Sequence, residues 1–217
     1  MTDFELARTN MVERQVRTND VTDHRIQDAM MAVPRERFVA RSRAALAYAE
    51  DAIEIAPGRH LMDPRSFSKL AQAAQIGASD VVLVVGCGTG YACAVLARLA
   101  QAVVGLEEDA DLARQAGQTL SALEVDNAAV VTGRLTEGYP SQAPYDVIFL
   151  DGGAEVIPAE LEDQLAEGGR LAAIVMEGRL GRAQIFAKVA GKISGRIAFD
   201  AGVPLLPGFA RVPAFTF

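Results

Sequence analysis

Residues 81–91 read VVLVVGCGTGY, five uncharged and mostly β-branched residues followed by a glycine-rich segment. Such a run is typical of a strand that is buried on both faces in a parallel sheet. Residues 92–100 are rich in helix-forming residues, so the glycines lie at a turn between a strand and a helix. Glycine lets a ligand approach the backbone, and the N-terminus of a helix offers it free N–H groups. The segment therefore predicts a ligand-binding turn.

An acidic residue, Glu107, follows the next predicted strand, residues 102–106. A carboxylate in that position can accept hydrogen bonds from ribose hydroxyls. The glycine spacing is G-x-G-x-G, which differs from the G-x-G-x-x-G of dinucleotide folds and resembles the loop of class I S-adenosylmethionine (SAM) methyltransferases. The alternative is a tight turn without a ligand and a solvated glutamate. Together the two features predict SAM binding by Val85, Gly86, Cys87, Gly88, Gly90, Tyr91, Glu107 and Glu108.

Composition limits the class of protein. A chain of 217 residues, half of them hydrophobic, fits one α/β domain with an N-terminal extension. The net charge of −7 argues against nucleic acid as the main partner, and no apolar run approaches a membrane span. The N-terminus lacks the apolar core of a signal peptide. Two cysteines and two scattered histidines favour reduced thiols, a cytoplasmic protein and no metal site.

The first 78 residues are predicted to form a helical extension on the substrate side of a SAM-binding core, residues 79–217. A helix is expected over residues 2–17, with Phe4, Leu6, Met11 and Val16 as core contacts. A second helix starts near Thr22, carries Ile26, Ala29 and Met30, and ends at Pro34. Residues 35–62 look irregular. Asp63 and Pro64 then open a helix that Gly77 stops.

From residue 80 onward, predicted strands alternate with helices. The strands are 81–85, 102–106, 128–132, 146–150 and 170–176, and the helices are 90–100, 109–123 and 158–165. Residues 183–190 and 193–200 form an antiparallel pair around Gly191. This pattern predicts a Rossmann-like, doubly wound α/β sheet, mostly parallel, with a C-terminal antiparallel hairpin. Gly86, Glu107, Gly133 and Asp151 all fall at carboxyl ends of strands and are candidates for one crevice.

The N-terminal third resembles a particular family. Residues 11–15 (MVERQ), 33–39 (VPRERFV) and 47–51 (AYAED), with Pro57-Gly58, look like the opening of protein-L-isoaspartate O-methyltransferases. Residues 82–91, 103–107, 145–153, 165–171 and 204–209 continue the resemblance. It implies a SAM-dependent enzyme that methylates the carboxylate of isoaspartyl residues in damaged proteins.

The active-site segment departs from that family. Where the family has a segment of the type Gly-Gln-Thr-Ile-Ser, this chain has Gly58-Arg59-His60-Leu61-Met62. Met62 therefore aligns with the family's active-site serine, and His60 aligns with its threonine. The resemblance implies that His60, Met62 and Asp63 lie in the catalytic segment. We expect residues 58–63 to form a substrate lip, with His60 or Arg59 donating to a carboxylate. The alternatives are a surface-loop histidine and a core-filling methionine.

The third-strand loop departs as well. The family reads Gly-Asp-Gly, and its aspartate recognises adenine, whereas this chain has Gly133, Arg134 and Leu135. Arg134 cannot accept a hydrogen bond, so adenine recognition has to differ, for example through backbone carbonyls. Asp151 is expected to contact the methionine end of SAM or the substrate, or to cap the following helix. Tyr91 either walls the methionine pocket or packs under the turn.

Three functions therefore remain open. The first is isoaspartyl methylation, and the second is a divergent family member that binds SAM but methylates another substrate or none. The third is a nicotinamide-dependent oxidoreductase, against which the glycine spacing and the C-terminal hairpin argue. The sequence does not indicate an oligomeric state.

Overall fold

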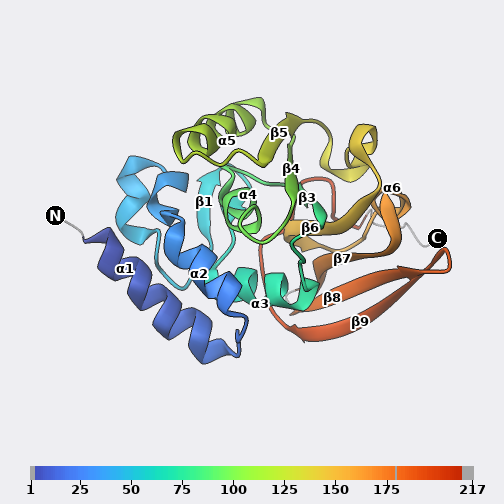
Figure 1. Ribbon diagram of the computed structural model, residues 1–217, viewed down its shortest axis with the longest axis horizontal. Helices are drawn as coiled ribbons and strands as arrows, with labels where there is room; N and C mark the ends of the chain where they lie inside the picture. Colours follow the sequence, from blue (N-terminus) through green and yellow to red (C-terminus); the bar gives the residue numbers. More distant parts are fainter. Residues whose placement is uncertain (1–2, 179, 212–217) are drawn as a thin grey trace, which may run out of the picture.

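The computed structural model describes residues 3–178 and 180–211 and shows a seven-stranded sheet between helical layers (Figure 1). The strand order is β5-β4-β3-β6-β7-β8-β9. The parallel strands are β3 (Val81–Val85), β4 (Ala102–Glu107), β5 (Ala128–Thr132), β6 (Tyr145–Ala154) and β7 (Leu165–Glu177). The antiparallel ones are β8 (Leu180–Val189) and β9 (Lys192–Asp200). The predicted doubly wound sheet and its C-terminal hairpin are confirmed.

The strand order reverses at β3. From β3 the chain moves outward through β4 to β5, then crosses back to β6 on the other side of β3. Helices α4 (Tyr91–Leu96) and α5 (Ala110–Ala122) make the first crossovers, and α6 (Ala159–Asp163) connects β6 to β7. In open α/β sheets, ligands bind beyond the carboxyl ends of the strands at such a reversal. This topology places the ends of β3, β4 and β6 beside one another.

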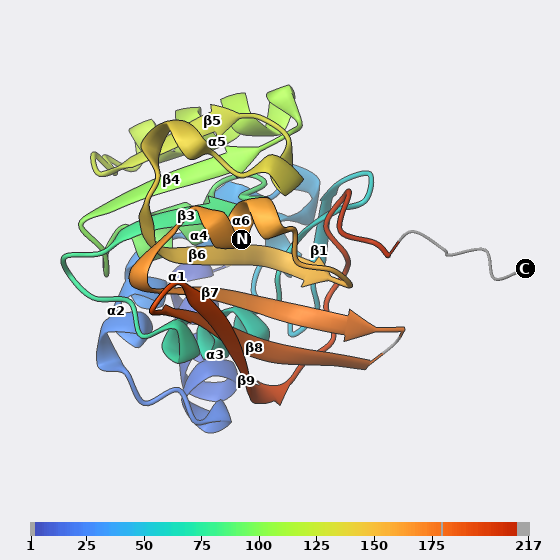
Figure 2. The same cartoon turned by 90° about the vertical axis from the view of Figure 1, so that its right-hand side faces the viewer.

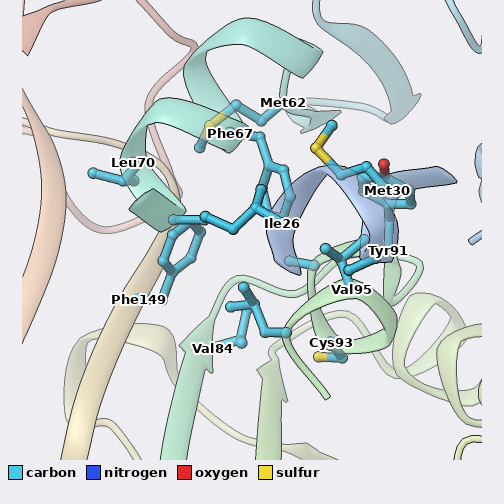
Figure 3. Packing of buried hydrophobic residues seen from close by; sticks show 14 of the residues in the cluster. Ile26, Met30, Met62, Phe67, Leu70, Val84, Tyr91, Cys93, Val95 and Phe149 are labelled. Atoms are coloured by element: carbon cyan, nitrogen blue, oxygen red, sulfur yellow. The ribbon is translucent and has the colours of Figure 1, made fainter. Parts of the chain in front are cut away.

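Alternate residues of β3 enter two separate hydrophobic cores. Val82 and Val84 face the core shared with the N-terminal helices, and Figure 3 shows Val84 in the same cluster as Tyr91, Val95 and Phe149. Leu83 and Val85 face the second core, under α6. Both faces of the strand are buried, as its uncharged sequence requires. The first core joins residues on both sides of position 78, and the division into two parts there stays a prediction.

The N-terminal helices largely follow the predictions. They are α1 (Phe4–Met11), continued by a π turn (Val12–Val16), then α2 (His24–Ala32) and α3 (Pro64–Ala74). Asp63 caps α3 as predicted, because its carboxylate accepts from the Ser66 N–H at 2.8 Å. Two details are corrected. Leu6 is 57% exposed, since it lies five positions before buried Met11 and therefore points about 140° away from it around the helix. Helix α3 ends at left-handed Gln75 before it reaches Gly77.

A short hairpin interrupts the region that was expected to be irregular. Strands β1 (Ile53–Ala56) and β2 (Arg59–Leu61) pair antiparallel across a turn in which Gly58 has a φ of +70°. Strands of three and four residues with charged residues between the apolar ones give only a weak sequence pattern. This hairpin carries the predicted substrate lip.

The C-terminal segment returns over the carboxyl end of β6. The Gly153 N–H donates to the Pro204 carbonyl at 2.8 Å, and the Leu206 N–H donates to the Gly153 carbonyl at 2.8 Å. In Figure 2 this red segment runs beside the cyan β1 region. None of the helices in the described part of the chain is long and apolar enough to cross a membrane.

Candidate functional site

The glycines of the turn after β3 adopt left-handed backbone conformations. Gly86 and Gly88 adopt φ angles of +77° and +54°, which favour glycine. The Gly86 and Cys87 N–H groups donate to the Leu106 carbonyl at 2.9 and 3.1 Å, which holds the turn against the end of β4. The turn therefore lies directly beside Glu107.

Glu107 is fully buried, and hydrogen bonds hold both of its carboxylate oxygens. Oε2 accepts from the Gly88 N–H at 2.7 Å, and Oε1 accepts from the N–H groups of Glu108 and Asp109 at 3.0 and 3.2 Å. Oε2 also lies 2.6 Å from Nη2 of Arg59, which donates in addition to the Gly86 carbonyl at 2.9 Å. The predicted ribose acceptor is thus ion-paired with a side chain of this same chain.

Two apolar side chains cover the glycines. A β-carbon placed on Gly86 would lie 2.6 Å from Cδ2 of Leu206, and one placed on Gly88 would lie 2.7 Å from Cδ1 of Ile55. The neighbouring cavity, which Arg59, His60, Met62, Asp151 and Leu206 help to line, measures about 10 Å³. That is room for about one water molecule. We call Ile55, Arg59 and Leu206 the blocking side chains.

Asp151 lies at the end of β6 and lines this small cavity. Burial raises the pKa of its carboxyl to about 7, while the nearby Arg59 and Arg35 oppose the shift and Glu107 adds to it. A carboxyl group with that pKa is neutral in a large fraction of molecules at neutral pH, and it can then donate a hydrogen bond.

Replacing Asp151 with asparagine should change how stability depends on pH. The folded-state pKa is raised above the unfolded value, so the wild type loses stability as the pH rises from about 4 through about 7. Each pH unit between the two pKa values changes the free energy of unfolding by about 1.4 kcal/mol. Between pH 5 and pH 8 the free energy of unfolding of Asp151→Asn should therefore rise by roughly 2–3 kcal/mol relative to that of the wild type. Urea unfolding at both pH values measures this difference. Parallel pH profiles for the two proteins would contradict the assignment.

The predicted catalytic segment is divided between the core and the lip. Met62 is buried next to Phe67, as Figure 3 shows, and Asp63 caps α3. His60 lies in β2 opposite Glu54 and is half-buried. Its Nδ1 atom is buried and has no hydrogen-bond partner among the residues that the structure describes. His60 is also one of the residues that line the cavity.

Tyr91 lies in the core beneath the turn. Its ring centroid is 5.5 Å from those of Phe38 and Phe67, and the Arg35 guanidinium lies 4.6 Å from the ring centroid. Burial raises the pKa of its hydroxyl, and Arg35 opposes that shift. Tyr91 therefore packs under the turn and is covered by Arg35.

The remaining predicted residues surround the crevice. Val85 and Cys87 are buried, Gly90 precedes α4, and Glu108 is exposed. The Gly133 N–H donates to the Glu107 carbonyl at 3.0 Å, and Leu135 is buried in the second core. Arg134 extends into solvent and pairs with Glu137 at 3.4 Å.

Comparison with known proteins identifies the family. The family model for protein-L-isoaspartate(D-aspartate) O-methyltransferase (PCMT) matches residues 7–204. The chain belongs to this family. A protein-L-isoaspartate O-methyltransferase of Koribacter versatilis is 37% identical over 215 residues, covering 99% of this chain and 97% of its own. One from Methanoculleus marisnigri is 38% identical over 168 residues, covering 77% of this chain and 76% of its own.

Solved structures of PCMT proteins share the fold. A protein-L-isoaspartate O-methyltransferase with 25% identity superposes with a TM-score of 0.81 over 93% of this chain and 66% of that one. A Plasmodium falciparum PCMT, whose structure holds S-adenosyl-L-homocysteine, is 20% identical with a TM-score of 0.77 over 90% of this chain and 96% of that one. The PCMT family is SAM-dependent, so SAM is the cofactor to test against this crevice.

The crevice offers the right chemistry for SAM but not the space. Glu107 and the glycine turn supply the acceptor and the bare backbone that a nucleoside needs. However, Arg59 occupies the acceptor, and Leu206 and Ile55 lie against the glycines. The residues fit the cofactor only after these three side chains move. The sequence pattern did not show this, although the arginine replacing the family's glutamine at position 59 was a visible signal.

Proposed function

We propose that this chain transfers the methyl group of SAM to the free carboxylate of isoaspartyl residues in damaged proteins or peptides. The observation that carries the proposal is the placement of Glu107, a buried carboxylate fixed by three backbone N–H groups beside the glycine turn. It lies at the reversal of strand order, where α/β sheets bind nucleosides. Membership of the PCMT family gives the acceptor class.

The chemistry demands little from side chains. Bound SAM supplies an electrophilic methyl group on a sulfonium. A carboxylate acceptor is already anionic at neutral pH, so the chain needs no general base. Its residues have to align the acceptor and exclude water, which the hairpin and residues 203–206 can do where they border the cavity.

Two side chains can hold the acceptor. The Nδ1 atom of His60 has no hydrogen-bond partner within residues 3–178 and 180–211, and a neutral Asp151 would remove one negative charge from the path of an incoming carboxylate. The serine hydroxyl of the family is replaced by buried Met62, so positioning has to come from such donors. From the sequence we also expect a cytoplasmic location and no nucleic-acid partner.

The proposal is tested with purified chain, SAM labelled in the methyl group and an isoaspartyl peptide. We expect label in this peptide, and none in the matched peptide with normal aspartate. Alkali should release the label as methanol, because the product is an ester. If calorimetry shows that SAM binds but neither peptide is labelled, the chain is instead a divergent family member with another acceptor. The comparisons do not favour that alternative or the nicotinamide-dependent oxidoreductase.

A further inference from the structure

Arg59 has an unusual environment for an arginine. It is 5% exposed, and one of its nitrogens, Nη2, binds both the Glu107 carboxylate and the Gly86 carbonyl. Its Nε atom is buried without a hydrogen-bond partner in the described part of the chain. A buried guanidinium with an N–H that lacks a partner is costly, and in the described part of the chain the ion pair with Glu107 and the hydrogen bond to the Gly86 carbonyl offset that cost.

The carboxylate of Glu107 cannot bind Arg59 and the ribose of a nucleoside at the same time. Glu107 is the acceptor predicted for the ribose hydroxyls, and its oxygens already accept from three backbone N–H groups and Arg59. Leu206 and Ile55 lie over the two glycines that a nucleoside has to approach. A cavity of about 10 Å³ leaves no room for both arrangements.

We propose that the blocking side chains hold the cofactor crevice closed, and that SAM binds only when Arg59 leaves Glu107, Leu206 leaves Gly86 and Ile55 leaves Gly88. The inference rests on the proposed function only in taking SAM as the ligand. Arg59 then lowers the affinity for SAM because it occupies the carboxylate of Glu107. The exchange keeps the charge balanced, because SAM brings a sulfonium cation to a crevice that contains the carboxyl groups of Glu107 and Asp151.

Closure has a defined effect on binding. If only a fraction of molecules is open, the apparent dissociation constant rises by the inverse of that fraction. The observed association rate should also level off at high SAM concentration, because opening then limits it.

The deciding variant is Arg59→Gln, which restores the glutamine that the segment of the PCMT family carries at this position. We expect its Kd for SAM, measured by calorimetry, to fall by about tenfold or more relative to the wild type. Its association rate, measured by surface plasmon resonance, should rise linearly with SAM concentration. Arg170→Gln is the matched control. It breaks another partly buried ion pair, with Asp80 at 2.6 Å, and should leave the Kd for SAM unchanged.

Leu206→Ala is the second variant, in case Arg59→Gln does not fold. It clears the space over Gly86 without unpairing Glu107, and we expect it to lower the Kd several-fold. The inference is overturned if the folded variants bind SAM no more tightly than the wild type does. If the wild type and all folded variants bind no SAM, the proposed function fails together with it. Binding by the variants alone would support the closed state most strongly.

Discussion

Glu107→Ala is expected to destabilise the chain by roughly 3–5 kcal/mol and to abolish SAM binding. The substitution leaves the Arg59 guanidinium buried without its carboxylate and removes the acceptor of the Gly88, Glu108 and Asp109 N–H groups. Urea unfolding gives the stability, and calorimetry at a temperature where the variant is folded gives the affinity. Because Glu108 is exposed, Glu108→Ala should change stability by less than about 0.5 kcal/mol.

The Glu107 result has to be separated from the closure by Arg59. In the Arg59→Gln background the blocking ion pair is gone, so the effect of a further Glu107→Ala change on affinity no longer includes the loss of that pair and reports the contact of Glu107 with the cofactor and with the backbone N–H groups of the turn. We expect the double variant to bind SAM far more weakly than Arg59→Gln does. Equal affinity of these two proteins would show that Glu107 does not bind the ribose.

Arg35→Ala is expected to cost a similar amount, roughly 3–5 kcal/mol. The Arg35 side chain is fully buried, and its Nε and Nη2 atoms donate to the carbonyls of Ala47 and Met62 at 2.7 and 2.6 Å. Its guanidinium also covers the ring of Tyr91. Alanine would leave a cavity and two unpaired carbonyls, and it would release the segment that carries Met62.

Two controls define the Arg35 prediction. Arg35→Lys should recover little stability, because one ammonium on a flexible stem cannot reproduce the two fixed bonds and the stacked plane. Arg25→Ala should cost less than about 1 kcal/mol, since Arg25 pairs with Asp23 at the surface. A loss below about 1 kcal/mol for Arg35→Ala in urea unfolding would contradict this account.

The sheet was predictable because its strands are locally consistent. Residues 81–85 and 128–132 are strands with the predicted limits, since uncharged runs that contain several β-branched residues, preceded by a polar residue and followed by glycine, have few alternatives. The hairpin at 53–61 was not predictable in the same way. Its strands are too short to show a period, and their residues Ile53 and Leu61 are buried in the first core together with residues distant in the sequence.

The site was predictable in its acceptors but not in its contents. Glycine spacing and a carboxylate one crossover later predicted where Gly86 and Glu107 meet. The partner of Glu107 lies 48 residues earlier in the chain, and no periodicity connects positions so far apart. The residue that recognises adenine was not predictable for a related reason. Arg134 pairs with its local neighbour Glu137 on the surface, and the sequence indicates backbone carbonyls but no acidic side chain in place of the family's aspartate.

Two of the three blocking side chains belong to one structural unit, the β1–β2 hairpin. Ile55 and Arg59 belong to the two strands of this one hairpin, and they reach Gly88 and Gly86 respectively. A hinge motion of this hairpin would therefore move Ile55 and Arg59 away from the glycine turn at the same time. His60 is next to Arg59 and would move with them. Binding of the methyl donor would therefore be coupled to the position of the substrate lip that faces a damaged protein.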